Sequence, residues 1–219
     1  MTSSLDRLLA EEPRKNEAAL GRTLAAVRGE LALKRPVRRW RTEVAWVVAA
    51  SGGLGTAVAL VLLAFGQLSV SFLLGRAPLL ALLVTTSAVC AWAGLSPRGR
   101  WLQVWGVGLA LTSAAALVLA RVPVQARPTL PEWLCTVSHI GVGSIPVIVA
   151  VLFLRSAVFQ PLRALVVGLS AGTAGAFLGE LACGQGWRHV AGYHVSAWAV
   201  VAVAALLMSR SLEPRSFAP

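Results

Sequence analysis

Six apolar segments, each about 20 residues long, most constrain how this chain of 219 residues can fold. At a rise of about 1.5 Å per residue, a helix of that length crosses the roughly 30 Å hydrocarbon layer of a membrane. The segments lie at residues 44–65, 77–95, 102–120, 133–154, 162–182 and 190–208. They predict an all-α fold, a polytopic membrane bundle of six transmembrane helices that follows a short amphipathic helical tail.

The composition agrees with a membrane protein and argues against two classes of soluble protein, an enzyme and a nucleic-acid binder. Hydrophobic residues make up 57% of the chain and charged residues 13%, which is far from the usual soluble mixture. After Glu43 the only carboxylates are Glu132, Glu180 and Glu213, so we predict that the protein is not an enzyme. The net charge of +11 would suit a nucleic-acid binder. Because the Lys and Arg residues mostly flank apolar segments, we instead expect a lipid bilayer as partner and no direct nucleic-acid binding.

The distribution of positive charge predicts how the bundle is oriented in its membrane. With the N-terminus inside, twelve Lys and Arg residues lie near span ends on the inner side and four, Arg76, Arg121, Arg127 and Arg188, on the outer side. Positive charge concentrates on the cytoplasmic side of membrane proteins, so both termini should be cytoplasmic. The predicted organisation is a cytoplasmic partner-binding tail at 1–42, the membrane bundle at 43–209 and a cytoplasmic C-terminal tail at 210–219.

The N-terminal tail carries an apolar stripe on a predicted helix that starts near Asn16. Leu20, Leu24, Val27 and Leu31 recur at spacings of four, three and four residues, as on one face of an amphipathic helix. A shorter helix before Pro13 carries further apolar residues, Leu5, Leu8 and Leu9. Two interpretations stay open: the stripe binds in the groove of a partner protein, or it lies on the inner leaflet of the membrane.

The fifth segment is rich in small residues, including Gly168, Gly172, Gly175 and Gly179. Such residues let helix backbones approach closely in a membrane, so this helix is expected near the centre of the bundle. Ser170 lies in a Gly-x-Ser-x-Gly pattern that resembles the turn of a serine hydrolase. Its predicted depth differs by about 9–12 Å from that of His139 and His194, so we expect a packing role instead.

Several side chains with redox or metal-binding capacity fall at the predicted outer end of the bundle. The candidate sensor residues are Cys135, His139, Glu180, Cys183 and His194, with His189 in the loop between the last two spans. Each residue alone is more simply interpreted as packed or solvated. Together, two cysteines at one depth favour a disulfide or a metal site about as strongly as packing. We predict no bound cofactor, with a metal ion or a tetrapyrrole at this end as the open alternatives.

The second half of the chain carries a set of short motifs, namely Glu132-Trp133-Leu134-Cys135, Ala171-Gly172-Thr173-Ala174-Gly175-Ala176, Cys183 and Tyr193-His194. Together these motifs resemble the NrsF family of six-span membrane anti-sigma factors. The start, from Ser3 to Ala10, also resembles the cytoplasmic tail of that family. The resemblance implies a negative regulator of transcription in the bacterial inner membrane. Its tail at 1–42 would bind an extracytoplasmic-function sigma factor, hold it at the membrane and release it on a light or oxidative-stress signal. The alternatives are a small membrane transporter and a structural membrane subunit.

Overall fold

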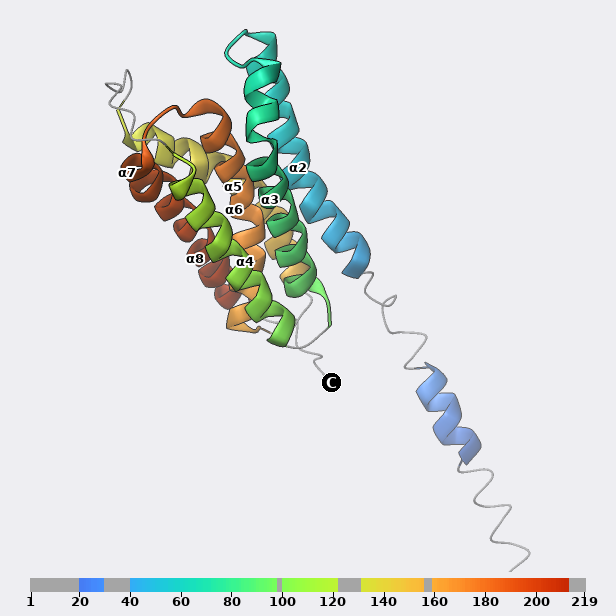
Figure 1. The fold of residues 1–219 in the computed structure, drawn as a ribbon. Coiled ribbons are helices and arrows are strands. Elements are labelled where there is room, and N and C mark those ends of the chain that lie inside the picture. The colour runs from blue at the N-terminus through green and yellow to red at the C-terminus, as the bar shows by residue number, and fades with distance from the viewer. Residues whose placement is uncertain (1–19, 30–39, 98–99, 122–130, 156–158, 213–219) are drawn as a thin grey trace, which may run out of the picture. The chain divides into compact units, whose positions relative to one another are not determined.

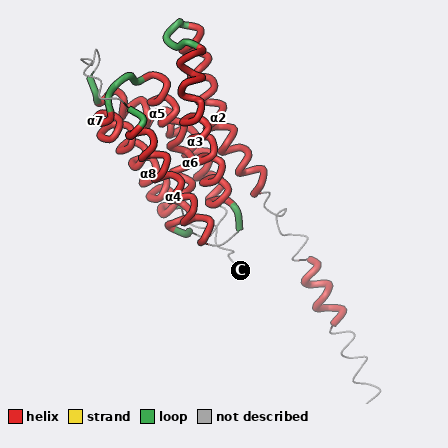
Figure 2. Tube along the Cα trace, viewed as in Figure 1, coloured by secondary structure: helices red, strands yellow, loops and turns green. Residues whose placement is uncertain are grey.

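The computed structural model describes residues 20–29, 40–97, 100–121, 131–155 and 159–212 (Figure 1). The chain divides into two compact units, Met1–Arg38 and Arg39–Pro219. In the first unit a helix is described at residues 20–29. In the second unit all of the regular structure within the described ranges is helical (Figure 2). The all-α fold predicted from the apolar segments is therefore confirmed.

Within the described residues of the second unit, six helical spans are long and apolar enough to cross a membrane, as predicted. They are α2 (Trp40–Ala64), α3 (Val70–Leu95), α4 (Arg100–Leu119), α5 (Trp133–Leu154), α6 (Pro161–Ala182) and a last span, Trp187–Ser211. The last span consists of α7 (Trp187–His189), the π-helix η1 (Val190–Val195) and α8 (Ser196–Ser211). Figure 1 shows these helices running up and down through one bundle, with the start of α5 and the end of α6 near α7. We call this the α7 end of the bundle.

Helix α3 begins earlier than the apolar pattern predicts, at Val70 instead of residue 77. Ser69 caps the helix, because its side chain accepts a hydrogen bond from the Phe72 backbone N–H at 3.2 Å. Arg76, predicted just before this span, therefore lies inside the helix, and its guanidinium pairs with Glu180 at 3.0 Å. Pro78 is also accommodated within α3. Arg76 bounds the predicted apolar segment in the sequence, but neither Arg76 nor Pro78 ends the helix.

Helix α6 forms the centre of the bundle. Its most apolar window is 78% buried, whereas no other span exceeds 44%. Residues of α6 belong to each of the three hydrophobic clusters, with Val166 packed toward α3 and α4, Val167 toward α2 and α5, and Ala171 toward α5 and α8. The central position expected from its small residues is confirmed.

Glycines allow the neighbours of α6 to approach closely. A methyl group added at Gly94 of α3 would lie 2.3 Å from Val167 Cγ2, and one added at Gly168 would lie 2.7 Å from Ala202 Cα of α8. Both distances are far below van der Waals contact. The packing of α3 and α8 on α6 therefore requires glycine at these two positions.

Ser170 lies in the same packed interface. Its hydroxyl is fully buried and donates to the Ser87 backbone oxygen of α3 at 2.7 Å. The Ser87 hydroxyl lies 3.3 Å from that of Ser170. These contacts join α3 to α6, as expected for a packing residue.

Candidate functional site

A buried carboxylate at the α7 end of the bundle is held between two arginines. Glu180, in the last turn of α6, is 2% exposed. Its Oε1 lies 3.0 Å from Nη1 of Arg76 on α3, and its Oε2 lies 2.8 Å from Nη2 of Arg121, which follows α4. We call Arg76, Arg121 and Glu180 the arginine clamp. It joins the ends of α4 and α6 to the first turns of α3.

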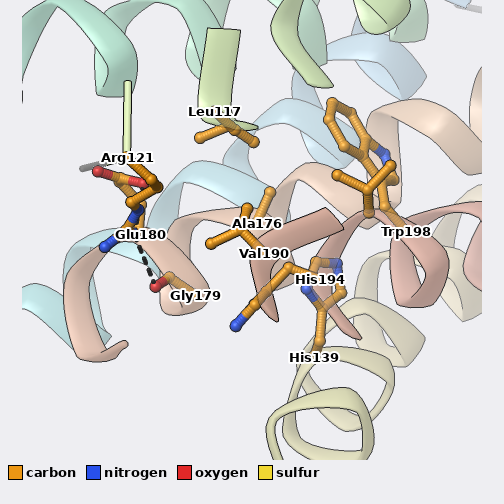
Figure 3. A pocket seen from close by; sticks show the side chains of 10 residues that line it. Leu117, Arg121, His139, Ala176, Gly179, Glu180, Val190, His194 and Trp198 are labelled. Carbon is orange, nitrogen blue, oxygen red and sulfur yellow. Dashed lines mark hydrogen bonds and ion pairs between the residues drawn. The ribbon is translucent and has the colours of Figure 1, made fainter. Parts of the chain in front are cut away.

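Arg121 also caps the C-terminal end of α6. Its Nη1 donates to the Cys183 backbone oxygen at 2.6 Å, and its Nη2 donates to the Gly179 backbone oxygen at 3.4 Å. Figure 3 shows Arg121 lying beside Glu180, with the contact to Gly179 drawn as a dashed line. The last carbonyls of a helix have no partner within it, so a guanidinium is well suited to this place. Arg121 thereby fixes the backbone that carries Cys183.

The π-helix η1 brings two histidines onto one face of the last span. In an α-helix, residues five apart point about 140° away from each other. A π-helix has hydrogen bonds between residues five apart and so places them above one another. His189 and His194 accordingly have ring centroids 5.3 Å apart. The Thr136 hydroxyl of α5 donates to the Tyr193 backbone oxygen at 3.1 Å and holds η1 against α5.

Two cysteines complete a group of four side chains, which we call the Cys–His cluster. Its members are Cys135, Cys183, His189 and His194, and one potential ligand atom from each lies within 4.8 Å of the others. Cys135 is in the first turn of α5, whereas Cys183 is the residue that ends α6. Both thiols are free and partly exposed, and both histidines are buried. The four side chains come from separate parts of the chain that the fold brings together.

Glycines on α6 make room for the imidazole rings. A methyl group added at Gly179 would lie 2.2 Å from His194 Nδ1, and one added at Gly175 would lie 2.1 Å from His139 Cδ2. His139 of α5 and His194 lie side by side in Figure 3, with ring centroids 6.0 Å apart. The glycines of α6 therefore leave space for imidazole rings as well as for close helix packing.

The structure gathers some of the candidate sensor residues and separates others. Cys135, Cys183 and His194 meet in the Cys–His cluster, together with His189. His189 lies in α7 instead of the predicted loop, because the last span begins at Trp187. Glu180 is engaged by the arginine clamp, and His139 lies outside the cluster, next to His194. Cys90 is fully buried and its thiol contacts the Gly106 backbone oxygen at 3.3 Å, as expected for a residue apart from this site.

Sequence reasoning did not assign a role to Arg76 or Arg121. One feature of the sequence could have indicated their role. Glu180 is a rare carboxylate within the spans, and a buried carboxylate requires a cationic partner. Sequence reasoning also did not foresee that a π-helix would align His189 with His194, because no sequence pattern distinguishes six residues of π-helix from an α-helix.

The Cys–His cluster has the chemistry for redox reactions or for metal binding. Thiols that solutes can reach undergo oxidation and disulfide exchange, and thiolates with imidazoles are ligands for soft metal ions. A hollow of about 640 Å³ is lined by Cys183, Arg76 and Arg121 among others. Solutes at the α7 end can therefore reach Cys183.

The tail helix presents part of the predicted apolar stripe. Leu20, Leu24 and Val27 are 59%, 48% and 45% exposed. Leu31 and the earlier residues Leu5, Leu8 and Leu9 lie outside the described residues. The described part of the stripe is therefore an exposed apolar face on one short helix.

Comparison with known proteins identifies a full-length relative. The chain is 60% identical over 215 residues to the carotenogenesis protein CarR of Myxococcus xanthus, and the alignment covers 98% of this chain and 97% of CarR. No family model matches the chain, and no solved structure matches it. Because the similarity covers the tail and all six spans, the chain belongs to the family of the carotenogenesis protein CarR.

Proposed function

We propose that this protein is a membrane-bound anti-sigma factor. It is a non-enzymatic negative regulator of transcription that sequesters an extracytoplasmic-function sigma factor of the CarQ type and releases it on a light or oxidative-stress signal. The observation that carries the proposal is the 60% identity with CarR over nearly the whole of both chains. Since that relative is named a carotenogenesis protein, we propose carotenoid synthesis genes as the regulated set.

The tail helix supplies the proposed contact with the sigma factor. Its exposed apolar face, formed by Leu20, Leu24 and Val27, suits a hydrophobic groove, in which an amphipathic helix binds through residues three and four apart. A sigma factor needs its own apolar surfaces to engage RNA polymerase, so a helix bound there would block that contact. Binding of the same face to the inner leaflet is the competing interpretation.

The bundle serves as an anchor in the bacterial inner membrane in this proposal, with both termini in the cytoplasm. A transporter would need ionisable groups along a path across the membrane. In the described part of the bundle, the buried ionisable side chains instead belong to the α7 end: Arg121, His139, Glu180, His189 and His194. This distribution favours an anchor with a sensor at one end over a transporter.

The test is to purify the full-length tagged protein from membranes of its own host, kept in the dark or exposed to light. Proteins that copurify are identified by mass spectrometry. We expect one extracytoplasmic-function sigma factor in the dark sample and its loss after illumination. Failure of any sigma factor to copurify in the dark would contradict the proposal.

A further inference from the structure

We propose that the Cys–His cluster is a binding site for a soft metal ion with a filled d shell, of which Zn²⁺ is the first candidate. The ligands are Cys135, Cys183, His189 and His194. This inference does not depend on the proposed function, because the site would bind its ion whether or not the tail binds a sigma factor.

The geometry of the cluster is close to that of a tetrahedral site. The four potential ligand atoms lie within 4.8 Å of one another. With metal–sulfur distances of about 2.3 Å and metal–nitrogen distances of about 2.0 Å, ligand atoms around one zinc ion lie about 3.3–3.8 Å apart. Contraction by about 1 Å, within reach of small side-chain rotations, would complete the coordination sphere.

The buried histidines need a partner that the described residues do not supply. His194 is 6% exposed, and neither of its ring nitrogens has a hydrogen-bond partner within the described ranges. Burial of a polar group without a partner is costly. Coordination of a metal ion by one nitrogen would remove part of that cost. Gly179 and η1 hold the ring in the cluster, since any larger residue at 179 would displace it.

The charges balance when the ion is divalent. Binding follows Zn²⁺ + 2 R–SH → Zn(S–R)₂ + 2 H⁺, in which the two thiol protons pass to the solvent and the imidazoles bind as neutral ligands. Two thiolates neutralise the ion, so the Cys–His cluster itself carries no net charge. Glu180 is not required as a ligand, because each of its oxygens already pairs with an arginine.

A carboxylate stands beside one of the imidazoles. Oε1 of Glu132 lies 3.8 Å from Nδ1 of His189. Histidines that bind metals commonly donate their other ring N–H to such a group, which fixes the ring and its tautomer. Two sulfur and two nitrogen ligands favour Zn²⁺ or Cu⁺ over the hard ions Mg²⁺ and Ca²⁺.

The first test measures metal content. The full-length protein, purified in detergent with a thiol-free reductant, is dialysed against Zn²⁺ and analysed by mass spectrometry of the metal. We expect one zinc ion per chain, and its loss in the variants Cys135→Ser, Cys183→Ser and His194→Ala. The control Cys90→Ser should keep the ion, because Cys90 is buried away from the cluster. Retention of zinc by both cluster cysteine variants would overturn the proposal.

The second test needs no substitution and so does not depend on how the variants fold. The reduced wild-type protein is treated with a maleimide in the presence of Zn²⁺, Cu⁺ or Mg²⁺, and labelled cysteines are identified by mass spectrometry. We expect Zn²⁺ to protect Cys135 and Cys183 together, and Mg²⁺ to protect neither. Stronger protection by Cu⁺ at equal concentration would assign the site to copper. Equal labelling with and without either soft ion would rule the site out.

Discussion

Arg121 and Glu180 form an ion pair at 2.8 Å in the interior of the bundle, where neither residue is more than 8% exposed. The same guanidinium donates to the backbone of Cys183. One side chain thus links the end of α4 to the end of α6 and to one residue of the Cys–His cluster. A desolvated charge is stable only when it is paired. Substitution of Arg121 should therefore affect both the stability of the bundle and the position of Cys183 in the Cys–His cluster.

Replacement of Arg121 by Leu should strongly destabilise the bundle. The substitution leaves Oε2 of Glu180 without its partner and removes the cap from α6. Loss of one member of a buried pair costs about 3–5 kcal/mol, and we expect a decrease of that order in the free energy of unfolding in detergent micelles. Arg188→Leu is the matched control, since Arg188 is exposed at the same end. Equal effects of the two substitutions would contradict a structural role for the clamp.

Substitution of Gly175 by Ala should displace the imidazole ring of His139. The added methyl group would lie 2.1 Å from His139 Cδ2, so the ring or the helix must move. Overpacking of this kind costs about 1–3 kcal/mol, measurable as a decrease in the free energy of unfolding. Gly108→Ala in α4 is the control, because a methyl group there meets no atom within 4 Å. It should be neutral or slightly stabilising, as expected for Ala in a helix. A tolerated Gly175→Ala would show that the ring is not held there.

The architecture could be predicted from the sequence because it depends on segment length and hydropathy. Long apolar segments have few alternatives in a membrane, and the small residues of α6 already indicated its central place. The early start of α3 could not be predicted, because it depends on a tertiary contact. Arg76 is accepted within the helix since Glu180, more than 100 residues later, provides its charge partner.

From the sequence, the candidate site could be predicted only as a set of residues at a similar depth in the membrane. Helix order places Cys135 and Cys183 at the same end of the bundle, but it does not say which neighbours face them. The alignment of His189 with His194 depends on η1, and the exclusion of Glu180 depends on the two arginines. Both features result from packing between helices, which the periodicity of a single helix does not predict.

Both termini should lie in the cytoplasm, because twelve Lys and Arg residues are predicted on that side and four on the other. A reporter that is active only outside the inner membrane is fused after Pro219 or inserted between Val122 and Pro128. We expect no activity from the first fusion and activity from the second. The opposite pattern would place the Cys–His cluster on the cytoplasmic side.

The exposed apolar face of the tail helix should be required for repression. Replacement of Leu20, Leu24 and Val27 by Asp places three charges in the proposed contact, where unpaired charge is costly. We expect constitutive expression from the target promoter and loss of the copurified sigma factor, with unchanged insertion into the membrane. The control replaces Ala25, Ala26 and Gly29 by Asp, which adds the same charge to the opposite face of the helix. If the first variant still represses, the tail does not bind through this face.

The response to light or oxidant should depend on Cys135 and Cys183. If a change at these thiols alters how the starts of α5 and η1 pack on the end of α6, it shifts the equilibrium between two arrangements of the bundle. A shift from almost all of one state to almost all of the other needs about 5.5 kcal/mol, which oxidation of the two thiols can supply. Cys135→Ser and Cys183→Ser, each made singly, should therefore repress normally in the dark and fail to derepress.

The measurement is the activity of the target promoter with and without light or oxidant, with Cys90→Ser as the control that should respond like the wild type. Cys90 shares the thiol chemistry but lies fully buried against Gly106. A loss of response confined to Cys135 and Cys183 would separate sensing from anchoring, because repression would remain intact. An unchanged response in both variants would assign these cysteines to packing. The signal would then act elsewhere, for which His139 and His194, with ring centroids 6.0 Å apart, are the next residues to substitute.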